Sequence, residues 1–165
     1  MIRFLACAAL LATFAAADDF SYDAFKPTTF TQLIAEEAGP DAATPYSTLG
    51  SLVFHPPVRA RVCVSYAGRH RPLGATNKKF LASYGKMNPG YQVWANTFEE
   101  EWLFRAEGRE WWLPVQKQVA AHFAEEIKPG EDTDLYLVYV GVAFTGKGAD
   151  TMLMVEEFQT PGHSP

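Results

Sequence analysis

The chain is poor in cysteine, with only Cys7 and Cys63 among its 165 residues. If residues 1–17 are removed, as argued below, Cys63 has no intramolecular partner, and this excludes a fold that depends on disulfides. Cys63 lies between Val62 and Val64, and these apolar neighbours predict a buried, unreactive thiol. Internal repeats are also absent, which excludes solenoids and other repeat architectures.

Long hydrophobic runs are absent apart from one near the start of the chain. Residues 4–14 are apolar, they follow Arg3, and small residues and two aspartates come next. The run has about half of the roughly 20 apolar residues that a membrane-crossing helix needs, and this order of features is typical of a secretory signal peptide. We therefore expect residues 1–17 to be a signal peptide and the mature protein to be exported to the periplasm or the exterior. No transmembrane segment is expected after cleavage.

Motifs for metal binding and nucleophilic catalysis are missing. The four histidines lie far apart, and none falls in the HExxH pattern or in a paired cysteine and histidine spacing that places ligands on one face. No serine or cysteine has the surroundings of an activated nucleophile. We expect no metal, no cofactor and no enzymatic activity.

One stretch, GVAFTGKGAD at residues 141–150, approaches a phosphate-binding loop. Gly141, Gly146 and Lys147 have the required spacing, but Gly148 stands where a serine or threonine would hold magnesium. The TMLMVEEF that follows is typical of a strand, whereas a phosphate-binding loop must lead into a helix. We therefore interpret the stretch as a hairpin turn and expect no ATP binding.

Residues 18–57 are predicted to form an N-terminal arm, a short helix and a linker. Thr29 and Gln32 have the spacing of a capping box at the start of an apolar periodic stretch, and Gly39 with Pro40 ends it. The chain from residue 41 to 57 is rich in proline, serine, threonine and glycine, which is typical of a surface loop.

Residues 58–158 are predicted to form one β-barrel-like domain. Its first strand starts at Val58 and has apolar residues on one parity, and GRHRPLG then turns the chain. A helix capped by Asn77 ends at Gly85, and residues 91–113 hold two or three strands with a tight turn at Glu107 and Gly108. A second helix is expected to begin at Pro114, before the strands LYLVYVGVAF and TMLMVEEF.

This order of elements determines the expected fold. The predicted order is a strand, a long loop, further strands, a helix and two final strands. This order matches a mainly β (α+β) fold, a small antiparallel Greek-key barrel of the oligonucleotide- and oligosaccharide-binding (OB) type. In such a barrel one helix lies between the third and fourth strands. An α+β roll, with helices packed on one face of a curved sheet, is the alternative. Residues 159–165 are expected to be a disordered tail.

Aromatic residues recur at alternate positions around the predicted strand pair. Rows such as Trp94, Phe98, Trp102 and Phe104 can stack sugars or bases, and they can also form a core, because each ring buries about 150 Å² or more. We expect most of this row to be core. Trp94 and Trp102 are the candidates to reach a ligand.

Acidic residues are absent between Ala42 and Phe98, although the whole chain has a net charge of −5. The same segment holds seven lysines and arginines. If they share an open face they attract anions, whereas if they lie beside acids such as Glu99 and Glu101 they are neutralised within the fold. The candidate anion-binding residues are Arg59, Arg61, Arg69, His70, Arg71, Lys78 and Lys79.

Three functions are consistent with these observations. The first is an exported, non-enzymatic binding module that offers a basic, partly aromatic surface to an anionic ligand or envelope partner. The second is a hydrolase of envelope polymers that uses Glu99 and Glu101, which share one side of a strand. The third is an envelope interaction protein that docks through its N-terminal arm and helix. The sequence does not specify the ligand or the oligomeric state.

Overall fold

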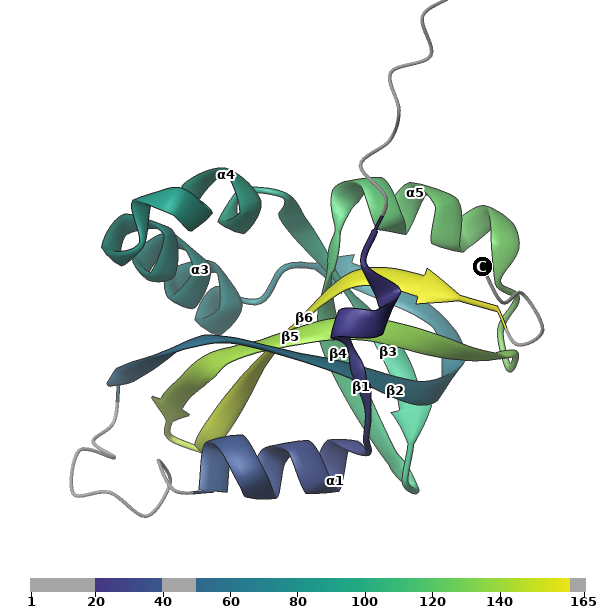
Figure 1. The fold of residues 1–165 in the computed structure, drawn as a ribbon, viewed down its shortest axis with the longest axis horizontal. Coiled ribbons are helices and arrows are strands. Elements are labelled where there is room, and N and C mark those ends of the chain that lie inside the picture. Colours follow the sequence, from purple (N-terminus) through teal and green to yellow (C-terminus); the bar gives the residue numbers. More distant parts are fainter. Residues whose placement is uncertain (1–19, 40–49, 161–165) are drawn as a thin grey trace, which may run out of the picture.

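The computed structural model describes residues 20–39 and 50–160. The expected signal peptide, most of the expected linker and the last five residues of the expected tail lie outside this range. Five long strands form a closed barrel (Figure 1). They are β2 (Leu52–Pro72), β3 (Phe98–Ala106), β4 (Arg109–Gln116), β5 (Asp132–Thr145) and β6 (Gly148–Gln159).

The strand order identifies the type of barrel. Neighbours run β2-β3-β4-β6-β5, and a further pairing of β2 with β5 closes the ring. β4 and β6 pair in parallel, the other barrel pairs are antiparallel, and helix α5 (Lys117–Glu126) lies between the third and fourth barrel strands. These are the connections expected of a small OB-type barrel, and the prediction is confirmed. The open sheet of an α+β roll does not fit a closed ring.

Shorter elements surround the barrel. Before β2 come η1 (Tyr22–Ala24), the two-residue strand β1 (Lys26–Pro27) and helix α1 (Phe30–Leu33), which continues as the π-helical turn η2 (Ile34–Ala38). Between β2 and β3 the chain forms α3 (Ala75–Met87), η3 (Pro89–Tyr91) and α4 (Gln92–Ala95). Figure 1 shows α1 below the barrel, α5 above it, and α3 and α4 together at one side.

The alternation predicted for the first strand is confirmed by the burial of β2. Ala60, Val62, Val64 and Tyr66 are buried inside the barrel, while Arg59 is exposed on the opposite parity. Cys63 is exposed, so the prediction of a buried thiol is wrong. Successive side chains of a strand point to opposite faces, and two buried valines therefore place the residue between them outside. Slight desolvation of this exposed thiol, together with the nearby Asp134 and Asp132, raises its pKa.

Two separate cores explain why β5 is apolar on both parities. The main core fills the barrel with β5 residues such as Leu135 and Leu137, and α1 and α5 cover it. A second core lies between the α3–α4 pair and the outer face of the β5–β6 hairpin, where Val138 and Val140 meet Phe80 and Tyr84. The lobe formed by α3 and α4 is therefore a packed part of the fold.

Several predicted boundaries are wrong. β2 begins at Leu52, where a linker was expected, and it continues through most of the expected turn at residues 68–74 to end at Pro72. Helix α3 is capped by Gly74 rather than Asn77 and continues to Met87, beyond Gly85. The segment around Trp94, expected as strand, is the helical turn α4.

The second helix also starts later than expected. Pro114 is a strand residue opposite Glu101, and α5 begins at Lys117. The proline is tolerated within β4 because this strand meets β6 only at Val115, so the edge near Pro114 needs no backbone donor.

The stretch resembling a phosphate-binding loop is a hairpin, as expected. β5 leads through a turn at Gly146 and Lys147 directly into β6. Gly141 serves a different purpose: its φ is +142°, and a Cβ there would lie 2.0 Å from the Val53 carbonyl oxygen. The first glycine of the motif is thus required by close approach of β5 to β2.

Candidate functional site

The seven basic residues of the acid-free segment do not gather on one face. Arg59 and Arg61 lie on the outer side of β2 where it pairs with β1 and β5. Arg69 and Arg71 lie at the far end of the same strand, and about 33 Å of strand separates Arg61 from Arg71 at roughly 3.3 Å per residue. The remaining three are on α3: Lys78, Lys79 and Lys86.

Few of these cations are neutralised by carboxylates. Among the described residues, Arg71 is the only one of the seven that forms an ion pair within 4 Å, and its partner is Glu101. Arg59 lies over the Phe25 ring, with its guanidinium carbon 5.8 Å from the ring centroid. His70 contacts Glu100, with 3.3 Å between its Nδ1 and the nearer carboxylate oxygen, and its ring stacks on Trp102.

The two candidate aromatic residues are held by the fold. Trp102 is 4% exposed inside the barrel, and its indole N–H donates to Glu100. Trp94 is half-buried between α4 and β6, where its indole N–H donates to Glu156 at 2.7 Å. Neither tryptophan lines the cleft that is described next.

A cleft of about 520 Å³ lies between the N-terminal halves of β4 and β6. The two strands pair only at Val115 and Val155, so they separate toward the start of each strand. The first turn of α3 lines one side. We call this the β4–β6 cleft, and its polar and aromatic lining includes Arg71, Asn77, Glu101, Arg109, Trp111, Trp112 and Asp150.

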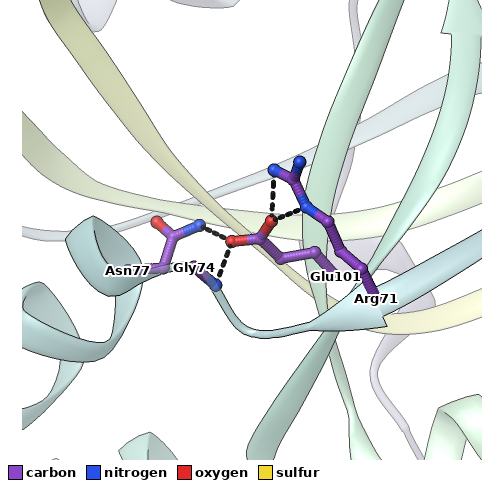
Figure 2. Close-up of polar contacts among 4 residues, drawn as sticks. All are labelled: Arg71, Gly74, Asn77 and Glu101. Carbon is purple, nitrogen blue, oxygen red and sulfur yellow. Dashed lines mark hydrogen bonds and ion pairs between the residues drawn. The ribbon is translucent and has the colours of Figure 1, made fainter.

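Glu101 is the fixed centre of one wall of this cleft. Its side chain is 2% exposed, yet both of its carboxylate oxygens are engaged (Figure 2). One oxygen accepts from the Arg71 guanidinium, at 2.7 Å from Nε and 2.6 Å from the terminal nitrogen. The other accepts from the Gly74 backbone N–H at 2.8 Å and from the Asn77 amide at 2.6 Å.

This environment makes Glu101 a buried structural carboxylate, unlike the exposed Glu99 on the same strand. The carboxylate caps the start of α3 from a neighbouring strand and accepts from the Gly74 N–H, a backbone donor that the helix itself leaves unpaired. Asn77, expected as the cap, instead donates its side-chain amide to Glu101. Because Glu101 joins β2, β3 and α3, it fixes the position of Arg71 relative to the cleft.

Arginines lie over both cleft tryptophans. The Arg71 guanidinium carbon is 4.1 Å from the ring centroid of Trp112, and that of Arg109 is 5.1 Å from the centroid of Trp111. Trp111 is held from the inside by stacking on Phe30, with 4.4 Å between ring centroids. Cation–π contact and packing therefore orient the two pairs.

Arg71 retains hydrogen-bonding capacity toward the cleft. Its side chain is 49% exposed, and Glu101 takes two of the five N–H donors of a guanidinium. The outward donors can bind a carboxylate or phosphate, and the indole surface of Trp112 offers an apolar contact for ring carbons. The two arginines are balanced by Glu101 and Asp150, so the cleft is close to neutral overall.

The carboxylates proposed for hydrolysis do not face one site. Glu99 lies on the exposed surface, 3.0 Å from the Lys117 ammonium, and lines a smaller cavity of about 260 Å³ beside Trp102. Glu101 lines the β4–β6 cleft, where four donors occupy its oxygens. This geometry does not favour joint acid and base action by the pair.

Sequence reasoning missed Arg109 and the role of the β4 tryptophans. Trp111 and Trp112 are consecutive, and the alternation of a strand would send them to opposite faces, so nothing in the pattern places them in one cleft. Only the divergence of β4 from β6 opens the space that both rings line. Among residues 20–39 and 50–160, no group of three or more histidine, cysteine or acidic side chains is placed to hold a metal ion.

No helix in the described part of the chain is long and apolar enough to cross a membrane.

Comparison with known proteins found no matching family model, no matching curated protein and no matching solved structure.

Proposed function

We propose that the protein is an exported binding module that holds an anionic, ring-bearing ligand, such as an acidic sugar, in the β4–β6 cleft. The observation that carries the proposal is the stacking of Arg71 on Trp112, fixed by the buried Glu101, beside a second arginine and tryptophan pair. The cleft volume of about 520 Å³ lies in the range of small-molecule sites. A carboxylate would bind the guanidinium donors while ring carbons contact the indole.

The near-neutral lining restricts the ligand further. Each cleft arginine has an acidic counterpart, in Glu101 and Asp150, so a dense polyanion gains little long-range attraction. We therefore favour a ligand with one or a few negative charges, recognised at close range. A binding role is favoured over hydrolysis because the donors around Glu101 leave it no free oxygen for proton transfer.

Tryptophan fluorescence tests this proposal directly, since two of the four tryptophans line the cleft. The probes are oligogalacturonate, a neutral galactose oligomer of the same length and a short single-stranded oligothymidylate. We expect saturable binding of oligogalacturonate and at least about tenfold weaker binding of the neutral oligomer, because each charge-assisted hydrogen bond contributes about 1.5–3 kcal/mol. Tighter binding of the oligonucleotide would replace the acidic sugar with a phosphate ligand.

Arg109→Gln tests the contribution of the cleft arginines, and Arg105→Gln is its control. Arg109 is exposed and forms no ion pair within 4 Å among the described residues, so its replacement should leave the fold intact and weaken oligogalacturonate binding about tenfold. Arg105→Gln removes an exposed arginine outside the cleft and should leave affinity unchanged. Equal affinity for charged and neutral oligomers, or no effect of Arg109→Gln, would refute the proposal.

A further inference from the structure

The lobe between β2 and β3 carries the exposed hydrophobic surface of the described protein. We define the α3–α4 lobe as residues 73–97. In the described part of the chain the large hydrophobic side chains that stay exposed are Met87 at 69%, Val93 at 81% and Tyr91 at 40%. All three belong to this lobe, and they lie within one short stretch around the connection from α3 to α4.

The exposed stretch is held by a rigid base. Phe80, Leu81 and Tyr84 on α3 are buried against the outer face of the barrel. Tyr91 packs its ring against Tyr84 and the α4 tryptophan, with centroid distances of 5.7 Å and 6.0 Å. The connection is therefore a fixed protrusion on which Val93 is 81% exposed.

The same lobe presents a basic stripe. Lys78, Lys79 and Lys86 are exposed on α3, and spacings of one, seven and eight residues place them on one side of the helix. The lobe contains no aspartate or glutamate. None of the three lysines forms an ion pair with a described carboxylate, although the Lys79 ammonium donates to the Gly50 carbonyl at 3.3 Å.

We propose that the α3–α4 lobe docks on an anionic lipid bilayer, with Met87, Tyr91 and Val93 inserted at the level of the headgroups and the lysine stripe on the lipid phosphates. Each lysine near an anionic surface contributes about 1 kcal/mol, and each buried CH₂ group about 0.8 kcal/mol. Together these terms give weak, reversible binding. Residues 74–77 of the lobe line the β4–β6 cleft, but none of the side chains proposed to meet the bilayer does. The ligand proposal and this one can therefore fail independently.

The lysine cations of the lobe and its small exposed apolar area favour a lipid bilayer over a protein partner. Protein interfaces are depleted of lysine and enriched in arginine, whereas every cation of this lobe is lysine. Three exposed apolar side chains also supply far less than the roughly 800 Å² per partner of a stable protein interface. Lysine keeps its hydration and binds as a point charge, which suits a mobile layer of phosphates.

Vesicle co-sedimentation tests the proposal with the chain purified from an exporting bacterial host. Vesicles of phosphatidylglycerol with phosphatidylcholine are compared with phosphatidylcholine alone, at low salt and at 0.5 M NaCl. We expect binding to anionic vesicles that falls at least about tenfold at high salt, and little binding to zwitterionic vesicles. If residues 1–17 are retained, any vesicle binding that they cause is the same in all variants. Such binding is measured separately with the vesicles of phosphatidylcholine alone.

Two pairs of variants separate the electrostatic and apolar contributions. The double variant with Lys78→Glu and Lys79→Glu should bind anionic vesicles at least about tenfold more weakly. The control double variant, with Lys26→Glu and Lys128→Glu, changes the net charge by the same amount and should bind normally. Val93→Ser should reduce binding about threefold to tenfold and Val93→Leu should preserve it, with unchanged melting temperatures because Val93 is exposed.

The proposal is overturned by any of three results. These are no binding to anionic vesicles at low salt, equal loss in both lysine double variants, or binding that Val93→Ser leaves unchanged. Dimerisation that the lobe variants abolish, in the absence of vesicle binding, would assign the surface to a second copy of the chain.

Discussion

Arg71 and Glu101 lie opposite each other in the β2–β3 ladder, and their charged groups meet at 2.6 Å where the strands reach the first turn of α3. The contact joins three elements that are distant in the sequence. It also couples the fold to the candidate site, because Arg71 continues from Glu101 onto the face of Trp112. Removing Glu101 should therefore affect both stability and the cleft.

Glu101→Ala is expected to lower the free energy of unfolding by about 3 kcal/mol. The substitution leaves a cavity and deprives the Gly74 N–H, the Asn77 amide and Arg71 of their shared acceptor. Glu99→Ala, on the same strand, removes an exposed ion pair with Lys117 and should cost less than about 1 kcal/mol. Urea denaturation of both variants measures the difference, and equal costs would show that the buried contact contributes no special stability.

Trp112→Leu is expected to weaken ligand binding while preserving the barrel. The Trp112 side chain is half-buried on the outside of β4, so leucine keeps part of its packing but loses the surface on which Arg71 stacks. We expect about a tenfold loss of oligogalacturonate affinity, measured by calorimetry. Trp94→Leu is the control, because Trp94 lies outside the cleft, and an equal loss in both variants would indicate a general structural effect.

The order of elements was predictable because local patterns determine it. Apolar alternation identified β2, continuous apolar character identified β5, and the φ values of +55° at Glu107 and +71° at Gly108 confirm the tight turn expected there. The boundaries were less predictable. Pro114 fits either the first turn of a helix or an unpaired strand edge, and only the tertiary position of β4 decides between them.

The candidate site was harder to predict because it forms where two strands separate. Arg71 was selected from its charge alone, whereas its geometry depends on Glu101, which lies on another strand. The sequence marks Glu101 as one of three consecutive glutamates, and nothing local distinguishes it from the exposed Glu99. Burial of one member of such a run is decided by which strand and helix pack beside it.

Glu107→Gln is expected to make stability less dependent on acid pH. Slight burial raises the pKa of Glu107, but hydrogen bonds from Thr31 and the Phe30 N–H, together with Arg109, outweigh it and lower the pKa. A lowered folded-state pKa stabilises the fold above the unfolded-state pKa, and this contribution is lost as the pH falls through the folded value. The variant should lose about 1 kcal/mol at pH 7, as for a helix cap. The difference in melting temperature should shrink below about pH 4.

Glu156→Gln is expected to stabilise the protein at pH 7, whereas Glu107→Gln destabilises it. Burial raises the pKa of Glu156 despite the Trp94 hydrogen bond and the nearby Arg59, so the folded protein disfavours the charged form. A raised carboxyl pKa lowers stability as the pH rises past the unfolded-state pKa. Glutamine accepts the same hydrogen bond without a charge and should raise the melting temperature at pH 7. The gain should vanish at acid pH, and a loss at pH 7 would show that attraction to Arg59 dominates.

Gly141→Ala is expected to be among the most destabilising single-methyl additions. The new Cβ would lie 2.0 Å from the Val53 carbonyl oxygen, and the φ of +142° disfavours any side chain. Together the clash and the backbone strain should cost roughly 2–5 kcal/mol. Gly146→Ala is the matched control in the following turn, where no atom lies within 4 Å of the added carbon. Thermal unfolding should separate the two variants clearly. If both were tolerated equally, the close contact of β2 with β5 that completes the barrel would not exist in solution.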